Sequence, residues 1–376
     1  MKILLIDDQS LKGWKQILEI VLFENNPIEI AENYSSAKQK LENDIYDLIF
    51  LDLRFNEGDH LKYGDLKQFN GYKILTEIIR KDFNSLNFSS PVIIFSATNK
   101  IWNIDQMLHH GADCYYIKEH PDYSYDVEYS KENLTALKRN TLQLLKLSTK
   151  RRQIWLKIQE IENLLSSISN RNISKRIIEK LKIGYGLLFR KTTEIENKYL
   201  IFNNQVISFI VFWSILEEIV KDSFIDNWIK SGDDEGKMRN NKWVLKNRSI
   251  FVEDLITYNA NQKQGGYEVG MKYNKTTNLY ESSKHIIDVN DSEISFYRGK
   301  ISLSLQVYAV LLLGKNWIPT TANNKFNPLN DYRNKIDFIH SSTNSIFNEN
   351  LSKKDSEIEG YNKCIEMLNF IKDILQ

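Results

Sequence analysis

The chain has 376 residues, enough for two or three domains, each with its own hydrophobic core. Its 50 basic and 49 acidic residues give a net charge of +1, so no chain-wide field attracts nucleic acid or membrane, and any such site must be local. The composition, 42% apolar and 26% charged, is that of an ordinary soluble protein, and no apolar run approaches the roughly 20 residues that cross a bilayer. We therefore expect no membrane partner.

Cysteine usage and the start of the chain indicate a cytoplasmic location. The two cysteines, Cys114 and Cys364, are far apart and lack metal-ligand spacing, which fits a reducing compartment. Met1-Lys2 lead directly into an apolar run, so the sequence leaves no room for a signal peptide. We therefore expect a cytoplasmic protein.

Over residues 1 to about 130, short apolar runs alternate with helical patterns. We predict strands at 2–6, 28–32, 47–52, 92–96 and 114–117. Helices are predicted near 12–24, 34–43, 71–83, 100–110 and from 131 onward. This alternation is typical of a parallel sheet with helices on both faces.

Carboxylates follow two of these strands. Asp7 and Asp8 come directly after the first, and Asp52 ends the third, whose apolar run predicts burial on both faces. The carboxyl ends of parallel strands lie at one edge of a sheet, where ligands bind, so the three acids should converge. Clustered carboxylates repel one another unless a cation lies among them, and Mg²⁺ is the preferred hard cation. Considered alone, Asp52 is equally well explained as a helix cap or the start of a turn.

Two further polar residues are predicted at the same edge. Ser96 ends the fourth strand, and Lys118 follows the fifth. With the acid cluster they supply what phosphoryl transfer needs: a carboxylate nucleophile, a metal that neutralises it, and two groups that hold the transferred oxygens.

These residues, in this order, resemble the receiver domain of two-component response regulators over roughly residues 1–125. The resemblance implies a flavodoxin-like α/β fold, a doubly wound parallel sheet of five strands in the order 2-1-3-4-5. It implies that Asp52 accepts a phosphoryl group from a sensor histidine kinase or another phosphodonor. Asp7 and Asp8 would then bind Mg²⁺ together with Asp52.

The same resemblance assigns the switch residues. It implies Ser96 as the switching hydroxyl, Lys118 as the conserved lysine, and Tyr115, three residues before it, as the switch aromatic. Gly111-Ala112-Asp113, just before Tyr115, also fits the family.

Two features depart from the family pattern. The family usually has Pro directly after the lysine, whereas Glu119-His120-Pro121 follows Lys118 here. The loop after Asp52, from Arg54 to Asn70, is about twice the usual length. It forms either a lid or partner surface, or simply a tolerated surface loop. Its charged residues include Asp59, His60, Lys62 and Asp65.

From about Glu132 the apolar pattern becomes a heptad repeat. One seam position holds Leu137, Leu144, Arg151, Ile158 and Leu165, and the other holds Asn140, Leu147, Ile154, Ile161 and Ile168. Because eight of these ten are Leu or Ile, the pattern favours a coiled coil and a parallel homodimer, with the two polar residues setting register. The alternative is one long amphipathic helix packed within its own chain. A second helical stretch is predicted near 173–200.

Helices dominate the carboxyl-terminal part. The runs 206–228 and 302–313 are apolar nearly all round, which predicts deeply buried helices. Glu217-Glu218 in the first run therefore require a partner or a site. Residues 231–293, between the two runs, are rich in Asn, Gly and Lys and less regular.

Basic residues surround one tryptophan in this irregular stretch. They are Lys237, Arg239, Lys242, Lys246 and Arg248, around Trp243. Basic residues interleaved with an aromatic ring can bind single-stranded nucleic acid, here RNA. A solvated face around an anchoring tryptophan is the simpler explanation.

A motif near residue 335 has the residues of a nuclease site. Pro328 and Asn330-Asp331 predict a helix start, and Arg333 and His340 are nearly two turns apart, so both would project from one face. Metal-free RNA cleavage requires such a pair, because the imidazole moves protons and the arginine holds the phosphate. Considered alone, a surface ion pair with an incidental histidine is the simpler explanation.

Arg333-Asn334, followed by His340 and a final amphipathic helix, resembles a HEPN domain over roughly residues 200–376. The resemblance implies an all-α bundle that dimerises around a shared cleft. It often implies a ribonuclease that needs no metal, with Arg333, Asn334 and His340 as its catalytic residues. The spacing of Arg333 and His340 lies at the edge of the family's range, and some members lack nuclease activity. The helix is marked by Ile358, Tyr361, Ile365, Leu368 and Ile371.

The sequence thus predicts a receiver domain at 1–130, a helical connector at 131–199 and a HEPN-like domain at 200–376. The leading hypothesis is a response regulator in which phosphorylation of Asp52 controls a dimeric, metal-independent endoribonuclease, acting in stress or phage defence. The alternative is a non-catalytic helical module that binds protein or RNA, in which Arg333 and His340 are structural.

Overall fold

The structure is a computed structural model. It describes residues 1–23, 27–55, 65–97, 101–118, 127–166, 171–189, 204–227, 242–245, 256–258, 267–269, 271–274, 279–282, 307, 310–311, 315, 317, 319–336 and 353–376. The chain forms two compact units, Met1–Gln159 and Glu160–Gln376. The boundary falls inside one long helix, within the connector expected from the sequence.

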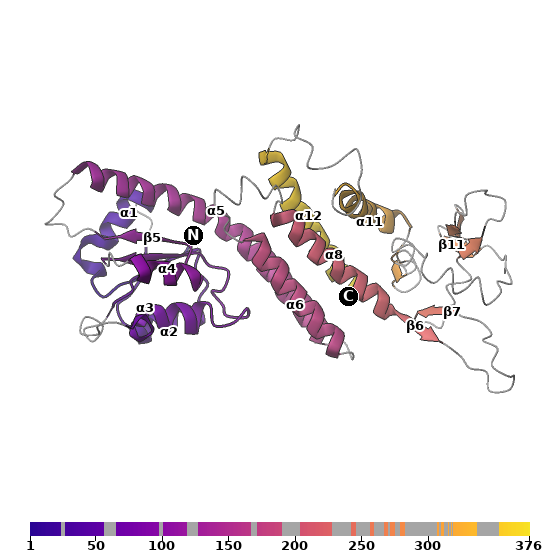
Figure 1. Ribbon diagram of the computed structural model, residues 1–376, viewed down its shortest axis with the longest axis horizontal. Helices are drawn as coiled ribbons and strands as arrows, with labels where there is room; N and C mark the ends of the chain where they lie inside the picture. The colour runs from indigo at the N-terminus through magenta and orange to yellow at the C-terminus, as the bar shows by residue number, and fades with distance from the viewer. Residues whose placement is uncertain are drawn as a thin grey trace. The chain divides into compact units, whose positions relative to one another are not determined.

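The first unit is built on one parallel sheet (Figure 1). Its strands are β1 (Ile3–Ile6), β2 (Glu29–Ala31), β3 (Leu48–Leu51), β4 (Val92–Ser96) and β5 (Cys114–Ile117). They lie in the order β2-β1-β3-β4-β5, so the predicted strands and their order are confirmed. Every residue of β1, β3 and β4 is buried, as expected for strands covered on both faces.

Helices cover both faces of this sheet. They are η1 (Ser10–Trp14), α1 (Lys15–Phe23), α2 (Tyr34–Asn43), η3 (Leu66–Gln68), α3 (Asn70–Lys73), η4 (Ile74–Ile79), α4 (Ile101–His109) and α5 (Val127–Ser166). One core joins the sheet to α2, η4 and α4 through Leu41, Leu75 and Met107. The other joins it to α1 and α5 through Leu18 and Leu137.

The helix predicted for 71–83 is shorter in the structure and ends at Ile79. The side chain of Arg80 accounts for this end. Its guanidinium donates hydrogen bonds of 2.8 to 3.2 Å to four backbone carbonyls, those of Asn87, Phe88, Ser90 and Gly111. These bonds satisfy three carbonyl groups of the following loop and one in the turn between α4 and β5.

The heptad stripe of α5 packs within its own chain. Leu137 and Leu144 belong to the core of the first unit, and Ile154 and Ile158 are fully buried. In a coiled-coil dimer these side chains would be exposed in the single chain and covered only by a partner. The predicted coiled-coil seam is therefore corrected to the single-chain alternative for the described residues; Ile168 lies outside them.

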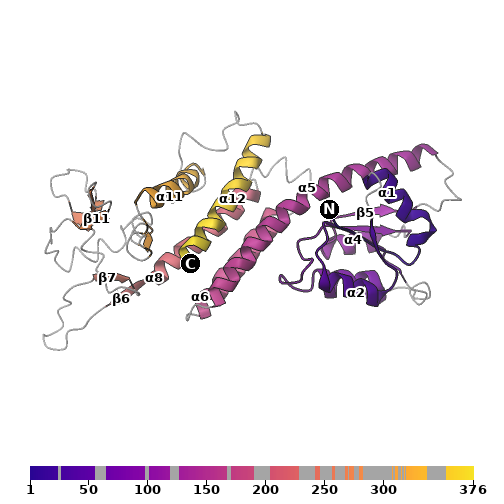
Figure 2. The same ribbon diagram turned by 180° about the vertical axis from the view of Figure 1, so that it is seen from behind.

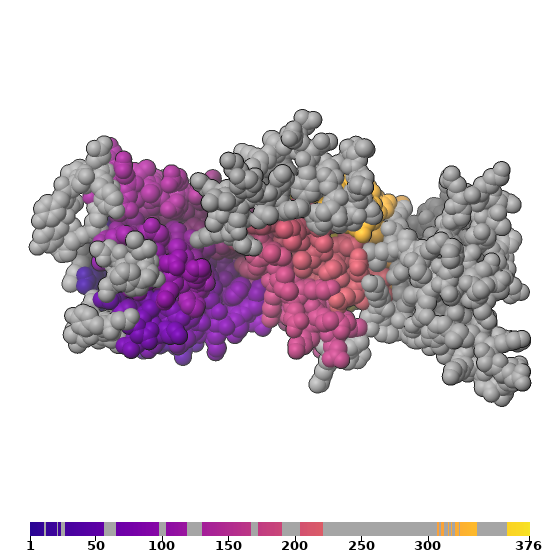
Figure 3. Space-filling model, viewed as in Figure 1, coloured from indigo at the N-terminus to yellow at the C-terminus, as the bar shows by residue number. Residues whose placement is uncertain are grey.

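The polar seam residue Arg151 does not set the register of a dimer, because it is buried and pairs with Asp113 at 2.7 Å. The opposite face of α5 is accessible. Leu142 and Leu156 on that face are 47% and 44% exposed. The space-filling view shows α5 at the surface of the first unit (Figure 3).

The second unit contains four described helices. They are α6 (Arg171–Leu188), α8 (Asn204–Ser223), α11 (Pro319–Asn334) and α12 (Lys353–Leu375). α8 packs against α6 and α12, and α11 packs against α12 (Figure 2). Trp213, Phe326 and Phe370 stack in sequence, with ring centroids 5.9 Å apart at each step, and join α8, α11 and α12. Within the described part of the chain, no helix has the length and apolar character needed to cross a membrane.

Of the two adjacent glutamates in α8, Glu218 links this helix to α6. Glu218 accepts a hydrogen bond from Arg176 at 3.2 Å and forms an ion pair with Lys180, both on α6. Burial opposes the charge of Glu218, but the contacts with Lys180 and Arg176 outweigh it and lower the pKa of that carboxyl. This ion pair therefore joins two packed helices rather than marking a site.

Gly184 sets the close approach of α6 and α8, and Gly184→Ala should destabilise the second unit. A Cβ at Gly184 would lie 2.2 Å from Cε1 of Phe212, whose ring is fully buried and cannot move aside. We expect a loss of about 1–3 kcal/mol in unfolding free energy, measured by chemical denaturation. Gly186→Ala on the same helix is the matched control. Nothing lies within 4 Å of its Cβ, so it should be neutral or stabilising, and equal losses for the two variants would contradict the argument.

Short strand pairs interrupt the helices of the second unit, so the prediction of an all-α fold is wrong. The helix predicted for 206–228 ends at Ser223, because the aromatic and β-branched Phe224-Ile225 favour a strand. The antiparallel pairs are β6 (Phe224–Asn227) with β7 (Lys242–Leu245), β8 (Ile256–Tyr258) with β9 (Tyr267–Val269), and β10 (Met271–Asn274) with β11 (Leu279–Ser282). Of the helix predicted for 302–313, the described residues Val307, Val310 and Leu311 are buried.

The helix start predicted near Pro328 is also wrong. α11 begins at Pro319 and contains Pro328 in its interior. Proline suits the first position of a helix, where its missing N–H is not needed, and Pro319 occupies that position. The helix ends at Asn334, so Arg333 lies in its last turn, and one helix face shared with His340 is not observed. His340 itself lies outside the described residues.

The final amphipathic helix is confirmed as α12. Tyr361, Leu368 and Ile371 are buried, and Ile365 is half-buried. The side chain of Ile358 is outside the described set. The apolar stripe thus forms the inner face of α12.

Candidate functional site

Three carboxylates meet at the carboxyl edge of the sheet. Asp7 and Asp8 follow β1 and Asp52 follows β3, and each offers a carboxylate oxygen within 4.8 Å of the other two. The Asp52 amide donates to the Ile6 carbonyl at 2.9 Å, which continues the pairing of β1 with β3. Adjacent strand ends therefore hold the acids together, as the sequence predicted.

The backbone fixes the carboxylates individually. Asp7 is fully buried, and one of its oxygens accepts a 2.9 Å hydrogen bond from the Gln9 amide. Asp52 accepts a 3.2 Å hydrogen bond from the Arg54 amide. Both acids thus keep fixed orientations before any ligand arrives.

Lys118 completes the cluster. Its Nζ donates to Asp7 at 2.7 Å and to Asp52 at 2.6 Å, and its backbone amide donates to the Ser96 carbonyl at 3.0 Å. The Ser96 side chain is close enough to the Asp52 carboxylate to favour its charged form and so to lower its pKa. Asp7, Asp52, Ser96 and Lys118 are all buried, so these contacts are formed away from bulk water.

The buried charges of this cluster shift one another's pKa values. Burial raises the pKa of Asp52, and Asp7 adds to the increase, while Lys118 and Ser96 oppose it. Burial works against the charge of Lys118, yet the two carboxylates outweigh it and raise the pKa of the lysine. The carboxylate oxygens of Asp7, Asp8 and Asp52 lie within 4.8 Å of one another, beside the ammonium group of Lys118. The oxygen donors of Asp7, Asp8 and Asp52 are those that a divalent cation such as Mg²⁺ prefers, so the residues fit a metal.

Tyr115 is the one predicted receiver residue that lies away from the cluster. Successive side chains of a strand point to opposite faces, so Tyr115 is 47% exposed while Tyr116 is buried and stacks on Phe95. The Phe95 ring in turn lies 5.2 Å from Nζ of Lys118. The exposed ring of Tyr115 is available to a partner rather than to the carboxylates.

Sequence reasoning missed the importance of Gly71 for this site. Its amide donates to the Leu53 carbonyl at 3.1 Å, and a Cβ there would lie 2.2 Å from the Asp52 carbonyl oxygen. The long loop returns at this point to the strand that carries Asp52. A glycine that ends a loop beside a strand end was the available signal. Of the charged loop residues, Asp65 caps η3, and Asp59, His60 and Lys62 lie outside the described residues.

Gly71→Ala should disturb Asp52 directly. The new methyl group would meet backbone atoms of Asp52 and Leu53 between 2.2 and 2.8 Å away, so the loop must shift. We expect a loss of about 1–3 kcal/mol in unfolding free energy and weaker Mg²⁺ binding, both measured by thermal unfolding with and without the metal. Lys67→Ala, an exposed change in the same loop, is the control. Unchanged metal affinity in Gly71→Ala would contradict the proposed contact.

The predicted nucleic-acid residues are only partly described. Lys242 and Trp243 belong to β7, where they pair with Asn227 and Asp226 of β6. Lys237, Arg239, Lys246 and Arg248 lie outside the described residues.

Arg333, at the end of α11, has a defined environment. It is half-buried, its guanidinium lies 5.8 Å from the ring centroid of Trp213, and its Nη1 donates to the Asn334 side chain at 3.1 Å. Trp213 is buried in α8, so the arginine lies where two helices pack.

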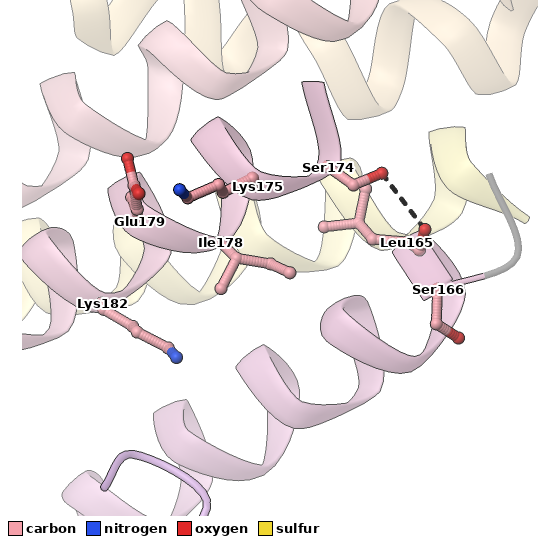
Figure 4. Close-up of a pocket in the computed structure, with 7 residues that line it drawn as sticks. All are labelled: Leu165, Ser166, Ser174, Lys175, Ile178, Glu179 and Lys182. Carbon is pink, nitrogen blue, oxygen red and sulfur yellow. Dashed lines mark hydrogen bonds between the residues drawn. The ribbon is translucent and has the colours of Figure 1, made fainter. Parts of the chain in front are cut away.

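A shallow hollow in the second unit lies between α6 and the end of α5 (Figure 4). Its volume is about 420 Å³, and its lining consists of Leu165, Ser166, Ser174, Lys175, Ile178, Glu179 and Lys182. Ser174 Oγ donates to the Leu165 carbonyl at 3.2 Å. The lining carries both lysines and a glutamate, so it does not favour a ligand of one particular charge.

No protein-family model and no curated protein matches the chain. Solved structures do match it. A response regulator receiver domain protein (CheY-like) from Methanospirillum hungatei JF-1 is 25% identical over 37% of this chain and 96% of that one, with a TM-score of 0.25. A two-component response regulator from Clostridium difficile is 26% identical over 37% and 96%, with a TM-score of 0.26. A Burkholderia pseudomallei response regulator, solved with a phosphorylated aspartic acid, calcium ion and citrate, is 16% identical over 41% and 83%, with a TM-score of 0.25.

Proposed function

We propose that the first unit is a phosphorylation-controlled receiver, in which Asp52 accepts a phosphoryl group and Mg²⁺ is held by Asp7, Asp8 and Asp52. One observation carries the proposal: three carboxylates, a lysine and a serine hydroxyl converge at one edge of a parallel sheet. A structural salt bridge would need only one carboxylate for Lys118, whereas three carboxylates within 4.8 Å of one another provide the oxygen donors of a divalent-cation site.

The chemistry follows from the position of each group. A carboxylate oxygen of Asp52 attacks the phosphorus of the donor, a new P–O bond forms, and the bond to the carrier breaks with its electrons leaving on the carrier. Bound Mg²⁺ would neutralise charge on the phosphoryl oxygens. Lys118, already 2.6 Å from the Asp52 carboxylate, would move its contact to a phosphoryl oxygen, and the Ser96 hydroxyl would donate to another.

Incubating the intact chain with acetyl phosphate and Mg²⁺ tests this function. We expect an acid-stable, base-labile acyl phosphate that mass spectrometry maps to Asp52, and no product when EDTA removes the metal. Lys118→Ala should lower the yield, because it removes the cation that contacts the reacting carboxylate. A phosphoryl group mapped to another residue would reject Asp52 as the acceptor.

For the second unit we propose the output that its motif suggests, a metal-independent endoribonuclease that acts as a homodimer. Arg333, Asn334 and His340 would be its catalytic residues. The support is the resemblance to the HEPN motif, the helical core of the unit, and the half-buried arginine in the last turn of α11. Since the heptad stripe of α5 is already covered within the chain, the dimer would use another surface, such as that of the helical unit.

A non-catalytic output is the alternative proposal. The contact of Arg333 with the Trp213 ring favours it, because a guanidinium over a buried aromatic ring stabilises helix packing without any substrate. In that case the second unit binds a protein or RNA partner, and phosphorylation of Asp52 controls the binding. The two outputs differ in whether RNA is cut or only retained.

A further inference from the structure

Two adjacent arginines of α5 form ion pairs at the amino edge of the sheet, opposite the acid cluster. Arg151 pairs with Asp113 at 2.7 Å, and both side chains are buried. Arg152 donates to the Asp47 carboxylate and to the Tyr46 carbonyl, each at 2.8 Å. A guanidinium that spans two acceptors fixes direction as well as distance.

The two acids paired with these arginines, Asp47 and Asp113, stand just before the two strands that lead to the site. Asp47 directly precedes β3, which Asp52 directly follows, and Asp113 directly precedes β5, which Lys118 directly follows. Each acid is five residues from its site residue, or about 16 Å of extended strand. Lys118 and Asp52 touch at one end of these strands, and Arg151 and Arg152 are neighbours at the other.

Both strand starts are themselves fixed to the sheet. The Asp113 carboxylate accepts from the Val92 amide at 2.9 Å, and its amide donates to the Val92 carbonyl at 2.7 Å. Asp47 exchanges hydrogen bonds of 2.7 Å with the backbone of Lys2 at the start of β1. One turn farther along α5, Trp155 Nε1 donates to the Phe83 carbonyl at 2.7 Å. A movement of β5 relative to β3 should therefore change the contacts that Arg151 and Arg152 of α5 make with Asp113 and Asp47.

We propose that Arg151 and Arg152 transmit the phosphorylation state of Asp52 to α5, by way of β5 and β3. The inference rests on the proposed phosphorylation of Asp52 and adds its route of regulation. A phosphoryl group at Asp52 adds negative charge and bulk between Asp52 and Lys118, so the direct 2.6 Å contact must lengthen. The ends of β3 and β5 then shift relative to each other, and the two ion pairs carry that shift to adjacent residues of one helix. α5 is continuous from Val127 to Ser166, so its orientation responds as a whole.

This coupling can be measured in two ways, because it is reciprocal. If a phosphoryl mimic at Asp52 changes the contacts of α5, then removing those contacts must change the affinity for the mimic. The test compares the intact chain with its Arg151→Ala/Arg152→Ala variant, using beryllofluoride and Mg²⁺ as the phosphoryl mimic. Hydrogen exchange is followed by mass spectrometry in peptides of α5 and in peptides around Asp52. Arg139→Ala, an exposed change on the same helix, is the matched control.

In the unaltered chain and in Arg139→Ala, the mimic should change exchange in α5 by at least about three-fold. In the double variant the α5 response should disappear while the peptides around Asp52 still respond. The apparent affinity for beryllofluoride should change by about five-fold or more. An α5 response that persists in the double variant overturns the proposal, as does an α5 that never responds while the site does.

A chain whose Asp52 peptides ignore the mimic would instead reject the proposed phosphorylation, and the transmission route with it. If the double alanine variant loses cooperative unfolding, Arg151→Lys/Arg152→Lys replaces it. Lysine keeps each charge but cannot span both acceptors of Arg152. The α5 response should then fall at least about two-fold, and a full response would overturn the proposal.

Discussion

Asp52→Asn should abolish acyl-phosphate formation from acetyl phosphate. The amide that replaces the carboxylate is a far weaker nucleophile, so no acyl phosphate should form at this position. Labelling of the intact chain followed by mass spectrometry measures the effect. Asp105→Asn on α4, an exposed acid outside the cluster, should label as the unaltered chain does.

The same variant should also lose stabilisation by Mg²⁺. A ligand at 100 times its Kd stabilises the folded state by about 2.7 kcal/mol, and the metal should act in this way on the unaltered chain. Asp52→Asn removes one of three oxygen donors and the negative charge that attracts the ion, so its unfolding midpoint should hardly respond to Mg²⁺. Undiminished labelling would show that the acceptor is another residue, and an undiminished metal response would show that Asp52 is not a metal ligand.

His340→Ala should reduce RNA cleavage by about 10²–10⁴-fold, the usual value of positioned proton transfer. Arg333→Ala should cost a comparable factor through lost stabilisation of the phosphate charge. The losses should be far from additive in the double variant, because both groups serve one transition state. The expected product carries a 2′,3′-cyclic phosphate. DNA should be inert and EDTA without effect, since the 2′-hydroxyl is the nucleophile.

Control substitutions and stability measurements distinguish a loss of catalysis from a loss of helix packing. Lys335→Ala, an exposed cation two residues after Arg333, should leave cleavage unchanged. Arg333→Ala also removes a guanidinium that lies over the Trp213 ring, so its unfolding free energy must be measured beside its rate. Preparations that cut RNA equally well with and without both substitutions would establish that the motif is structural and favour the binding module.

The parallel sheet was predictable because its signals are local to each strand. Each apolar run ends on its own polar residue, and the parallel order then brings Asp7, Asp52 and Lys118 to one edge. The fate of the α5 stripe was not predictable in this way. A coiled coil and a helix packed on its own domain require nearly the same apolar repeat, and the repeat does not identify what covers it.

The misplaced start of α11 has a similar cause. Pro328 carries the signal of a helix start, but Pro319 carries the same signal and is the first residue of the helix. Pro328 is tolerated because it lies on the exposed side, where the hydrogen bond it removes can be replaced by water. Local sequence alone does not rank the two prolines, since the choice depends on how α11 packs against α12.

The order in which the chain is made has a consequence for the Lys118 contacts. Asp7 and Asp52 precede the lysine by 111 and 66 residues, so both acids leave the ribosome well before the cation that joins them. Arg151 and Arg152, which hold the starts of β5 and β3, are synthesised later still. The site therefore has no local precursor, and contacts of such long range close slowly. In a nascent chain the contacts of Lys118 with Asp7 and Asp52 are therefore absent until β5 and the start of α5 have been made.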